Sequence, residues 1–278
     1  MWRSRLCMGT SMSYGIGIKE QIALLKGIGF DGYFVNWNTD VDVKDIKAFG
    51  DEIGMCFQSI HAPFGKVQYM WEECEEAERF TQVLIDCLGD CAANDVPIMV
   101  CHVIKGFDVH TPNDIGIKNF AKVVDKAEAL GVQIAFENTE GEEYLEAIMK
   151  AFWDRDCVKF CWDTGHEMCY NHSKDMLALY GEKLICTHLN DNLGIKDFEG
   201  KTTWHDDLHL LPFDGIADWK GIADRMNRCG YDGMLTFELN ITSKPNRHEN
   251  DVYGRMDIAD YFCEVYKRAC KVAALKNL

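Results

Sequence analysis

Short apolar runs alternate with longer segments of helical periodicity along nearly the whole chain, and this alternation constrains the fold more than any single motif. Eight runs rich in Val, Ile, Phe and Cys lie at residues 5–9, 31–37, 55–61, 97–103, 132–138, 158–163, 184–190 and 234–240. Between them, apolar residues recur three and four positions apart, and a glycine stands near the end of several segments, as in helices that turn into a strand. Near-continuous apolar strands are typical of parallel sheets covered by helices. The pattern therefore predicts the α/β class, with a (β/α)8 TIM barrel as a single domain over residues 1–278.

An open, doubly wound sheet is the alternative fold for the same alternation. Such a sheet is usually supported by a G-x-G-x-x-G motif after its first strand, and no such motif follows the first run here. The length of 278 residues also suits a closed barrel, so the barrel is the favoured prediction.

The charge balance bears on the class of partner. The chain has 29 Lys and Arg against 45 Asp and Glu, a formal net charge of −16. Nucleic-acid binding depends on clustered Lys and Arg that neutralise phosphates, and the sequence shows no basic stripe. We therefore expect no nucleic-acid partner.

Apolar content and cysteine usage indicate the compartment. No stretch approaches the about 18 uninterrupted apolar residues of a membrane span, and the N-terminus lacks the apolar run of a signal peptide. The 13 cysteines include no C-x-x-C pair, and most lie in apolar runs, such as Cys56, Cys101, Cys161 and Cys186. We expect a cytoplasmic protein with reduced, buried thiols and no membrane partner; the sequence leaves open whether it forms a homo-oligomer.

Six residues that can ligate a metal stand at the ends of the third to eighth runs: His61, His102, Glu137, Asp163, His188 and Glu238. The active site of a barrel is built from the carboxyl ends of its strands, so we expect these side chains to converge at one mouth. His166 lies one turn after Asp163. Asp207 and His209 lie in the long connection 191–220 and project to one side of an extended segment.

Each of these residues also has a purely structural interpretation. A single histidine at a strand end commonly makes a core or turn hydrogen bond, and Asp163 before Thr-Gly could form an Asx-turn. Glu137 and Glu238 are harder to explain in this way, because each follows an apolar run and a buried carboxylate needs a paired or bound cation. Carboxylate and imidazole ligands together suit Mn²⁺, Zn²⁺, Co²⁺ or Fe²⁺, so the sequence predicts a divalent cation of this group.

The motifs around these residues resemble those of the xylose isomerase-like TIM-barrel superfamily. The segments, in chain order, are SIHAPF, VCHVI, AFENTEG, WDTGHE, THLNDN, DLHLLPFDGIADW and FEL, and they cover nearly the whole chain. The superfamily groups sugar isomerases and epimerases, inosose dehydratases and endonuclease IV-type AP endonucleases. Resemblance to the sugar epimerases implies one divalent cation, Mn²⁺, Zn²⁺ or Co²⁺, held by Glu137, Asp163, His188 and Glu238.

The same resemblance implies the chemistry. We expect a metal-dependent isomerase or epimerase of a small sugar or sugar derivative, which works by proton abstraction and a metal-stabilised enediolate. Glu137 and Glu238 would remove and return the proton on opposite faces of the substrate. The expected substrate-binding residues are His61, His102, His166, His209 and Trp37, with Trp162 or Phe64 as further apolar cover.

Three other functions share parts of this pattern. The endonuclease branch holds three zinc ions with nine ligands, and all nine have counterparts here: His61, His102, Glu137, Asp163, His166, His188, Asp207, His209 and Glu238. Acidic strand-end loops and the segment LPFDGIADWKGI favour small-molecule chemistry over phosphodiester hydrolysis. An inosose dehydratase-type lyase would share the proton abstraction. A sugar-binding barrel without activity should have lost a metal ligand, and none is lost.

Overall fold

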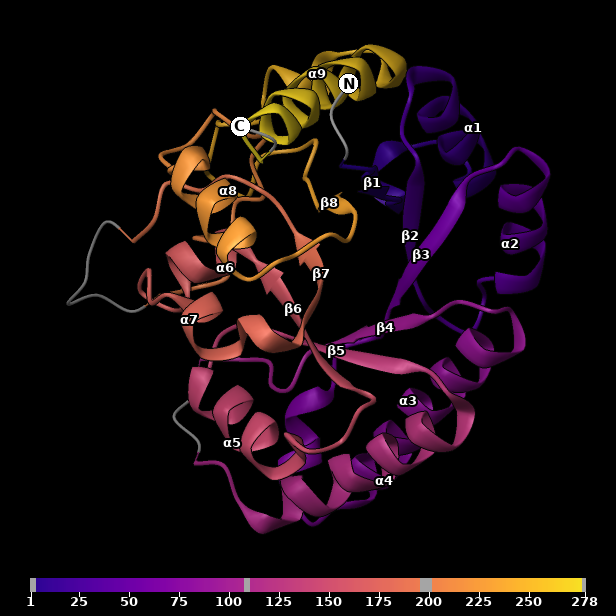
Figure 1. Ribbon diagram of the computed structural model, residues 1–278, viewed down its shortest axis with the longest axis vertical. Coiled ribbons are helices and arrows are strands. Elements are labelled where there is room, and N and C mark those ends of the chain that lie inside the picture. The colour runs from indigo at the N-terminus through magenta and orange to yellow at the C-terminus, as the bar shows by residue number, and fades with distance from the viewer. Residues whose placement is uncertain (1–3, 108–110, 196–201, 277–278) are drawn as a thin grey trace.

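The computed structural model describes residues 4–107, 111–195 and 202–276, and its centre is a sheet of eight parallel strands. The strands follow one another around the sheet in the order β7-β6-β5-β4-β3-β2-β1-β8. Figure 1 shows them inside a ring of helices. The strands are β1 (Leu6–Gly9), β2 (Gly32–Asn36), β3 (Cys56–His61), β4 (Ile98–Cys101), β5 (Gln133–Glu137), β6 (Val158–Asp163), β7 (Leu184–His188) and β8 (Leu235–Phe237). Each lies within one of the eight apolar runs, so the predicted α/β barrel is confirmed.

The sheet closes between β7 and β8. The backbone N–H of Leu189, directly after β7, donates to the carbonyl oxygen of Thr236 at 2.7 Å, and Leu189 and Phe237 form an isolated parallel bridge. The N–H of Thr236 donates instead to a side chain, Oγ1 of Thr187, at 3.1 Å. Closure brings the carboxyl ends of the eight strands to one mouth, where a barrel builds its site.

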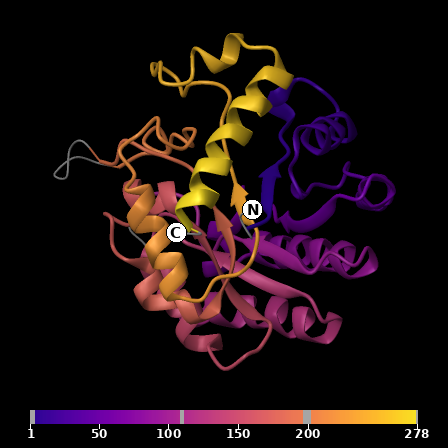
Figure 2. The ribbon, with the colours of Figure 1, turned by 45° about the horizontal axis from the view of Figure 1, so that its top comes forward.

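Helices cover the outside of the sheet, and α9 closes the ring. The α-helices are α1 (Ile18–Ile28), α2 (Val43–Glu52), α3 (Glu75–Ala93), α4 (Asp114–Leu130), α5 (Glu142–Phe152), α6 (Thr164–Cys169), α7 (Met176–Tyr180), α8 (Trp219–Arg228) and α9 (Ile258–Lys276). Short 3-10 turns are η1 (Met12–Tyr14), η2 (Val67–Trp71), η3 (Gly181–Lys183) and η4 (Tyr253–Arg255). Helix α9 contacts α1, α8 and β8, so the two ends of the chain meet on one side (Figures 1 and 2).

Several helices begin at the side-chain caps that their sequences provide. Asp42, Asn113 and Asp218 each accept a hydrogen bond from the backbone N–H three residues later, at the starts of α2, α4 and α8. Such caps satisfy N–H groups that a helix leaves free in its first turn. None of the helices in the described residues is long and apolar enough to cross a membrane.

The core has two parts. A large apolar layer fills the space between sheet and helices, and a small group lies inside the barrel: Ile98, Val100, Ala135, Cys161 and Cys186. All 13 cysteines are free and most are buried, as predicted. The expectation of burial is wrong for Cys56, because this residue opens β3 at the amino-terminal rim of the barrel, where its side chain is exposed.

A buried carboxylate anchors the long connection between β7 and α8. Asp191 accepts four hydrogen bonds at 2.8–2.9 Å, from the backbone N–H groups of Asn192, Phe213 and Ala217 and from Nε1 of Trp219. Because these donors come from both ends of the connection, Asp191 ties the segment together and holds its middle part over the mouth of the barrel.

Candidate metal centre and active site

All nine candidate ligands lie at the carboxyl mouth of the barrel. With the exception of Asp207, their possible ligand atoms fall into overlapping groups in which every pair of atoms lies within 4.8 Å. The largest of these, which we call the central group, is Glu137, Asp163, His188 and Glu238. It consists of the four residues for which the family resemblance implied a shared cation.

Three members of the central group are the last residues of adjacent strands. Glu137, Asp163 and His188 end β5, β6 and β7, and all three are fully buried. Nδ1 of His188 lies 2.9 Å from Oε1 of Glu137 and 3.2 Å from Oε2 of Glu238, the residue directly after β8. Parallel pairing sets this convergence, since Asp163 and His188 are register partners.

Two further histidines flank Glu137. Nε2 of His102 lies 3.1 Å, and Nε2 of His61 3.3 Å, from Oε2 of Glu137. This oxygen nevertheless accepts no hydrogen bond of good geometry. Two imidazole nitrogens and a carboxylate oxygen thus face one another without a directional bond, which is the arrangement of ligands around a common cation.

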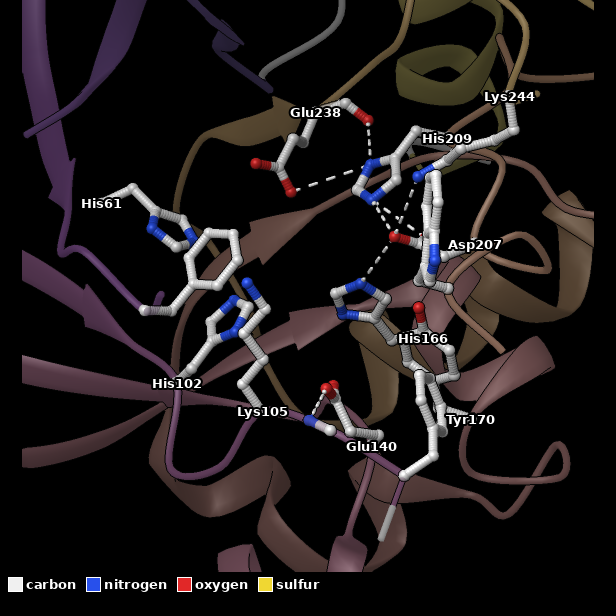
Figure 3. Close-up of a pocket in the computed structure, with 14 residues that line it drawn as sticks. His61, His102, Lys105, Glu140, His166, Tyr170, Asp207, His209, Glu238 and Lys244 are labelled. Carbon is white, nitrogen blue, oxygen red and sulfur yellow. Dashed lines mark hydrogen bonds and ion pairs between the residues drawn. The ribbon is translucent and has the colours of Figure 1, made fainter. Parts of the chain in front are cut away.

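A third group comes from the connections that follow the strands. Nε2 of His209 lies 3.0 Å from Oδ1 of Asp207, and Nε2 of His166 lies 3.5 Å from Oδ2 of the same carboxylate. Nδ1 of His209 also lies 3.0 Å from the carbonyl oxygen of Glu238. Figure 3 shows Asp207 between the two imidazoles.

The nine candidate ligands thus form two groups according to their place in the fold. The connection group consists of His166, Asp207 and His209. The strand-end group consists of the remaining six: His61, His102, Glu137, Asp163, His188 and Glu238.

Two asparagines fix the orientation of Asp163. Oδ1 of Asn138 accepts the Asp163 N–H at 2.8 Å, and Nδ2 of Asn190 donates to Oδ2 of Asp163 at 2.9 Å. The other oxygen, Oδ1, accepts the N–H of His166 at 2.7 Å and so caps α6. A Cβ on Gly165 would lie 1.9 Å from Oδ1 of Asn190, so this position has to be glycine for Asn190 to reach Asp163.

A cavity of about 560 Å³ opens above these groups. Six candidate ligands line it: His61, His102, His166, Asp207, His209 and Glu238. Aromatic side chains form much of the remaining wall: Phe64, Phe107, Tyr170 and Trp204. The combination of apolar walls and a few convergent polar groups is typical of a small-molecule site.

The structure places the predicted tryptophans apart from this cavity. Nε1 of Trp37 donates to Oδ2 of Asp90 on α3 at 2.6 Å, so the indole points outward between sheet and helix. Trp162 is fully buried, and its Nε1 donates to Glu167. Neither indole lines the cavity, whereas Phe64 does.

Sequence reasoning missed several residues of the site. Lys105, Glu140, Tyr170 and Lys244 line the cavity (Figure 3), as does Trp204, and none of these residues stands at a strand end. Their positions in the connections after β4, β5, β6, β7 and β8 are the signal that could have indicated them.

Mutual charge pairing shifts the pKa values at the mouth. Burial would raise the pKa of Glu238, but the adjacent His188 and His209 lower it to about 2. Burial raises the pKa of Asp163 to about 6, although His166 and His209 act in the opposite direction. Burial would lower the pKa of His209, but contact with Asp207 raises it to about 9. Protons on imidazoles therefore balance the carboxylates.

A divalent cation fits this arrangement. The donors are carboxylate and imidazole groups, which suit Mn²⁺, Zn²⁺ and Co²⁺. Oε2 of Glu137 is buried and has no hydrogen-bond partner, although two imidazole nitrogens lie 3.1 and 3.3 Å away. A cation would replace the imidazole protons as the charge that balances the carboxylates, with release of those protons.

The comparisons with known proteins agree on the fold. Residues 22–255 match the family model described as xylose isomerase-like TIM barrel. The sequence is 26% identical over 266 residues to the uncharacterized protein y4fM of Sinorhizobium fredii, covering 81% of this chain and 82% of that protein. A crystal structure described as IOLI protein with a binding zinc atom superposes with a TM-score of 0.76 and 17% identity, over 99% of both chains. A structure of L-ribulose 3-epimerase superposes with a TM-score of 0.73 and 15% identity, over 98% of this chain and 95% of that one.

Proposed function

Because the chain belongs to the xylose isomerase-like TIM-barrel family, we propose that it is a metal-dependent isomerase or epimerase of a small sugar or sugar derivative. The observation that carries the proposal is the central group. It joins two carboxylates, Glu137 and Glu238, to Asp163 and His188 within 4.8 Å, and Glu238 also lines the cavity. Similar solved structures include an L-ribulose 3-epimerase and a D-psicose 3-epimerase with D-tagatose from Clostridium cellulolyticum, which supports sugar chemistry.

The central group would hold one divalent cation, Mn²⁺, Zn²⁺ or Co²⁺. When bound, such a cation polarises a carbonyl group and stabilises the negative charge that forms when the neighbouring carbon loses its proton. Asn138 and Asn190 hold Asp163 in place for this role. Hydrogen-bond partners of metal ligands commonly fix the orientation of the ligand in this way.

Glu238 and Glu137 are the proposed proton carriers. Although burial would raise it, the pKa of Glu238 is lowered to about 2 by His188 and His209, so this carboxylate is ionised near neutral pH, as a general base must be. Glu137 is fully buried and does not line the cavity; His61 and His102, whose Nε2 atoms lie 3.3 and 3.1 Å from Oε2 of Glu137, stand between it and the open space. We propose that these histidines bind substrate hydroxyls and link Glu137 to the substrate.

The rest of the cavity wall supports a sugar. Asp207 contacts Nε2 of both His166 and His209, and all three side chains line the cavity, where a substrate hydroxyl group can replace one of these contacts. Phe64 and Tyr170 provide flat apolar surfaces: Phe64 stacks on His102 with ring centroids 4.4 Å apart, and Tyr170 on His166 at 5.0 Å. Phe64, rather than Trp37, is therefore the proposed apolar contact.

Proton exchange at carbon tests the proposal. Metal-loaded protein is incubated in D₂O with a panel of ketoses, aldoses, sugar phosphates and inososes, and deuterium at the carbon next to the carbonyl is measured by mass spectrometry and NMR. We expect exchange that requires the cation and is lost in Glu238→Gln. Neither exchange nor conversion with any sugar at full cation occupancy would overturn the proposal, whereas exchange with loss of water from an inosose would assign a dehydratase-type lyase.

An endonuclease IV-like activity is the second candidate, because the structure brings all nine counterpart ligands to one mouth, eight of them in overlapping groups of possible ligand atoms. The net charge of −16 opposes it, since a duplex would be repelled. Elemental analysis separates the two: one cation per chain supports the isomerase, and three zinc ions with metal-dependent cleavage of an abasic-site duplex support the endonuclease. Phosphodiester hydrolysis would leave every sugar unlabelled in the exchange assay.

A further inference from the structure

A pair of thiols lies inside the barrel one layer below the central group. Cys161 on β6 and Cys186 on β7 are register partners, and both are fully buried. Two residues further along the same strands, Asp163 and His188 are partners in the central group. Because side chains two apart on a strand point to the same face, the thiols face the barrel interior beneath those ligands.

These two thiols and His188 are close enough to share one ion. Their ligand atoms all lie within 4.8 Å of one another. His188 also has a ring nitrogen to spare: Nδ1 contacts Glu137 and Glu238, whereas Nε2 is buried and has no hydrogen-bond partner. An unpartnered imidazole nitrogen in a sealed core is uncommon and indicates a missing ligand or ion.

The surroundings keep Cys186 turned toward this space. Nε2 of Gln58 donates to Sγ of Cys186 at 3.5 Å, and Sγ of Cys7 donates to Oε1 of Gln58 at 3.7 Å. The amide of Gln58 thus connects two thiols inside the barrel. Apolar side chains, Ile98, Val100 and Ala135, complete the wall and exclude water.

We propose that Cys161, Cys186 and His188 form a second cation site, selective for thiophilic cations such as Cd²⁺ and Zn²⁺. Two thiolates and one imidazole are soft ligands, which favour such ions over Mn²⁺ or Mg²⁺. Binding displaces one proton from each thiol and the proton that Nε2 carries when His188 is charged, and a divalent cation with two thiolates is neutral, as a buried ion requires. The displaced protons pass to solvent.

The shared histidine makes the two sites compete. A neutral imidazole has one nitrogen free to ligate, so a thiophilic cation on Nε2 leaves the proton on Nδ1, which then cannot serve the central group. Occupation of the thiol site therefore weakens cation binding above it. This competition rests on the proposed function of the central group, whereas the thiol site itself does not.

Cadmium titration tests the site directly. Reduced, metal-free protein is titrated with Cd²⁺, and the ultraviolet thiolate-to-cadmium charge-transfer band and the released protons are measured. We expect a band that saturates at one Cd²⁺, with release of both thiol protons and of the Nε2 proton of charged His188, and its loss in Cys186→Ala. The matched control is Cys87→Ala: Cys87 and Cys91 are buried on α3 one turn apart, and the described residues include no metal-ligand group that contains them. This variant should keep the band.

Two further measurements guard against misfolding of the variant. Cys161→Ala should lose the band independently, and a ¹¹³Cd resonance of the unaltered protein should show sulfur ligation. A band that persists in both Cys161→Ala and Cys186→Ala, or that disappears in Cys87→Ala, would overturn the site, as would cadmium bound without sulfur ligation. Failure of sugar exchange with an intact cadmium band would reject the proposed function and leave the thiol site standing.

The competition has its own readout. Mn²⁺ bound to the protein is followed by electron paramagnetic resonance while Cd²⁺ is added. We expect half-displacement to need about tenfold more Cd²⁺ in Cys186→Ala than in the unaltered protein, because only direct replacement in the central group remains. Equal displacement curves would show that the thiol site does not act on the central group.

Discussion

The strand-end group and the connection group meet at the same mouth but are held there in different ways. Glu137, Asp163 and His188 are fully buried, end adjacent parallel strands, and are fixed by register. Asp207 and His209 retain 13% and 10% side-chain exposure, lie in the long connection after β7, and are placed by a tether at Asp191. His209 also adopts a left-handed backbone conformation, with φ of 47°.

This difference indicates that the two groups have different roles. A strand end cannot move without breaking the ladder, so the strand-end group suits a cation that needs fixed ligands. A connection can be repositioned without disturbing the barrel, and a non-glycine residue at positive φ is kept only where surrounding contacts enforce it. We therefore propose that the central group, within the strand-end group, binds the cation and that the connection group orients the substrate together with His61 and His102, and the following predictions test this assignment.

The largest expected effect is on turnover. Glu238→Gln should lower sugar turnover by about 10³-fold while leaving the fold intact, because it removes a ligand charge and a proton carrier together. The measurement is the rate of deuterium exchange with circular dichroism as a check on folding. Glu140→Gln is the matched control, since Glu140 lines the same cavity but its carboxylate accepts the N–H of Gly106 and lies outside the central group. Comparable losses in both variants would contradict the assignment.

The second effect is on stability as a function of pH. In the folded protein the pKa of His209 is raised from 6.5 to about 9, so the folded state holds this proton more tightly than the unfolded state. The resulting stabilisation, about 3 kcal/mol, is fully present below pH 6.5 and is lost as the pH rises through about 9. Contacts with carboxylates shift the pKa values of His166 and His188 in the same direction.

Urea unfolding of metal-free protein at about pH 6 and about pH 9.5 measures this change. His209→Gln should remove the part of the pH dependence that belongs to the connection group and leave the part due to His188. A free energy of unfolding that increases toward high pH in the unaltered protein would show that these histidines are not held as cations.

The third expected effect is on cation affinity, which should fall more for a substitution in the central group than for one in the connection group. Asp163→Asn should weaken Mn²⁺ or Zn²⁺ binding by about 100-fold, because Asp163 belongs to the central group. Asp207→Asn should change affinity by less than about tenfold, because Asp207 is paired with His166 and His209. Isothermal titration calorimetry gives both affinity and stoichiometry. Equal losses, together with three cations per chain, would instead make the connection group a metal site.

The smallest expected effect comes from the tether. Asp191→Asn should lower the free energy of unfolding by about 2 kcal/mol, since an amide cannot accept all four hydrogen bonds and leaves buried N–H groups unsatisfied. Hydrogen exchange should rise in residues 202–218, while cation affinity stays near its original value. Asp206→Asn, in the same connection but only partly buried, is the matched control. A loss of cation affinity in Asp191→Asn would show that the two groups are not independent.

Much of the strand-end group could be predicted from the sequence, because polar residues after apolar runs are conspicuous and parallel strands bring their ends together. His61, Glu137, Asp163 and His188 are the last residues of their strands, and His102 and Glu238 come one position later. The same reasoning failed for Trp37, which it placed in the substrate site. It also follows a strand, but its indole turns outward to Asp90, and the sequence does not reveal on which side of the barrel a residue beyond the strand will point.

The sequence by itself determined the barrel, its eight strands and the six polar strand ends, since periodicity and the chemistry of single residues are local properties. Only the tertiary structure decided which atoms face one another: the contact of His188 with Glu137, the place of Asp207 between two imidazoles, and the unpartnered Nε2 of His188 near two thiols. The composition of the cavity wall was also decided only by the tertiary structure, because Lys105 and Lys244 are far apart in the chain and lie in connections without a repeating pattern. Register and closure set these distances, and both depend on pairing between strands that the sequence separates.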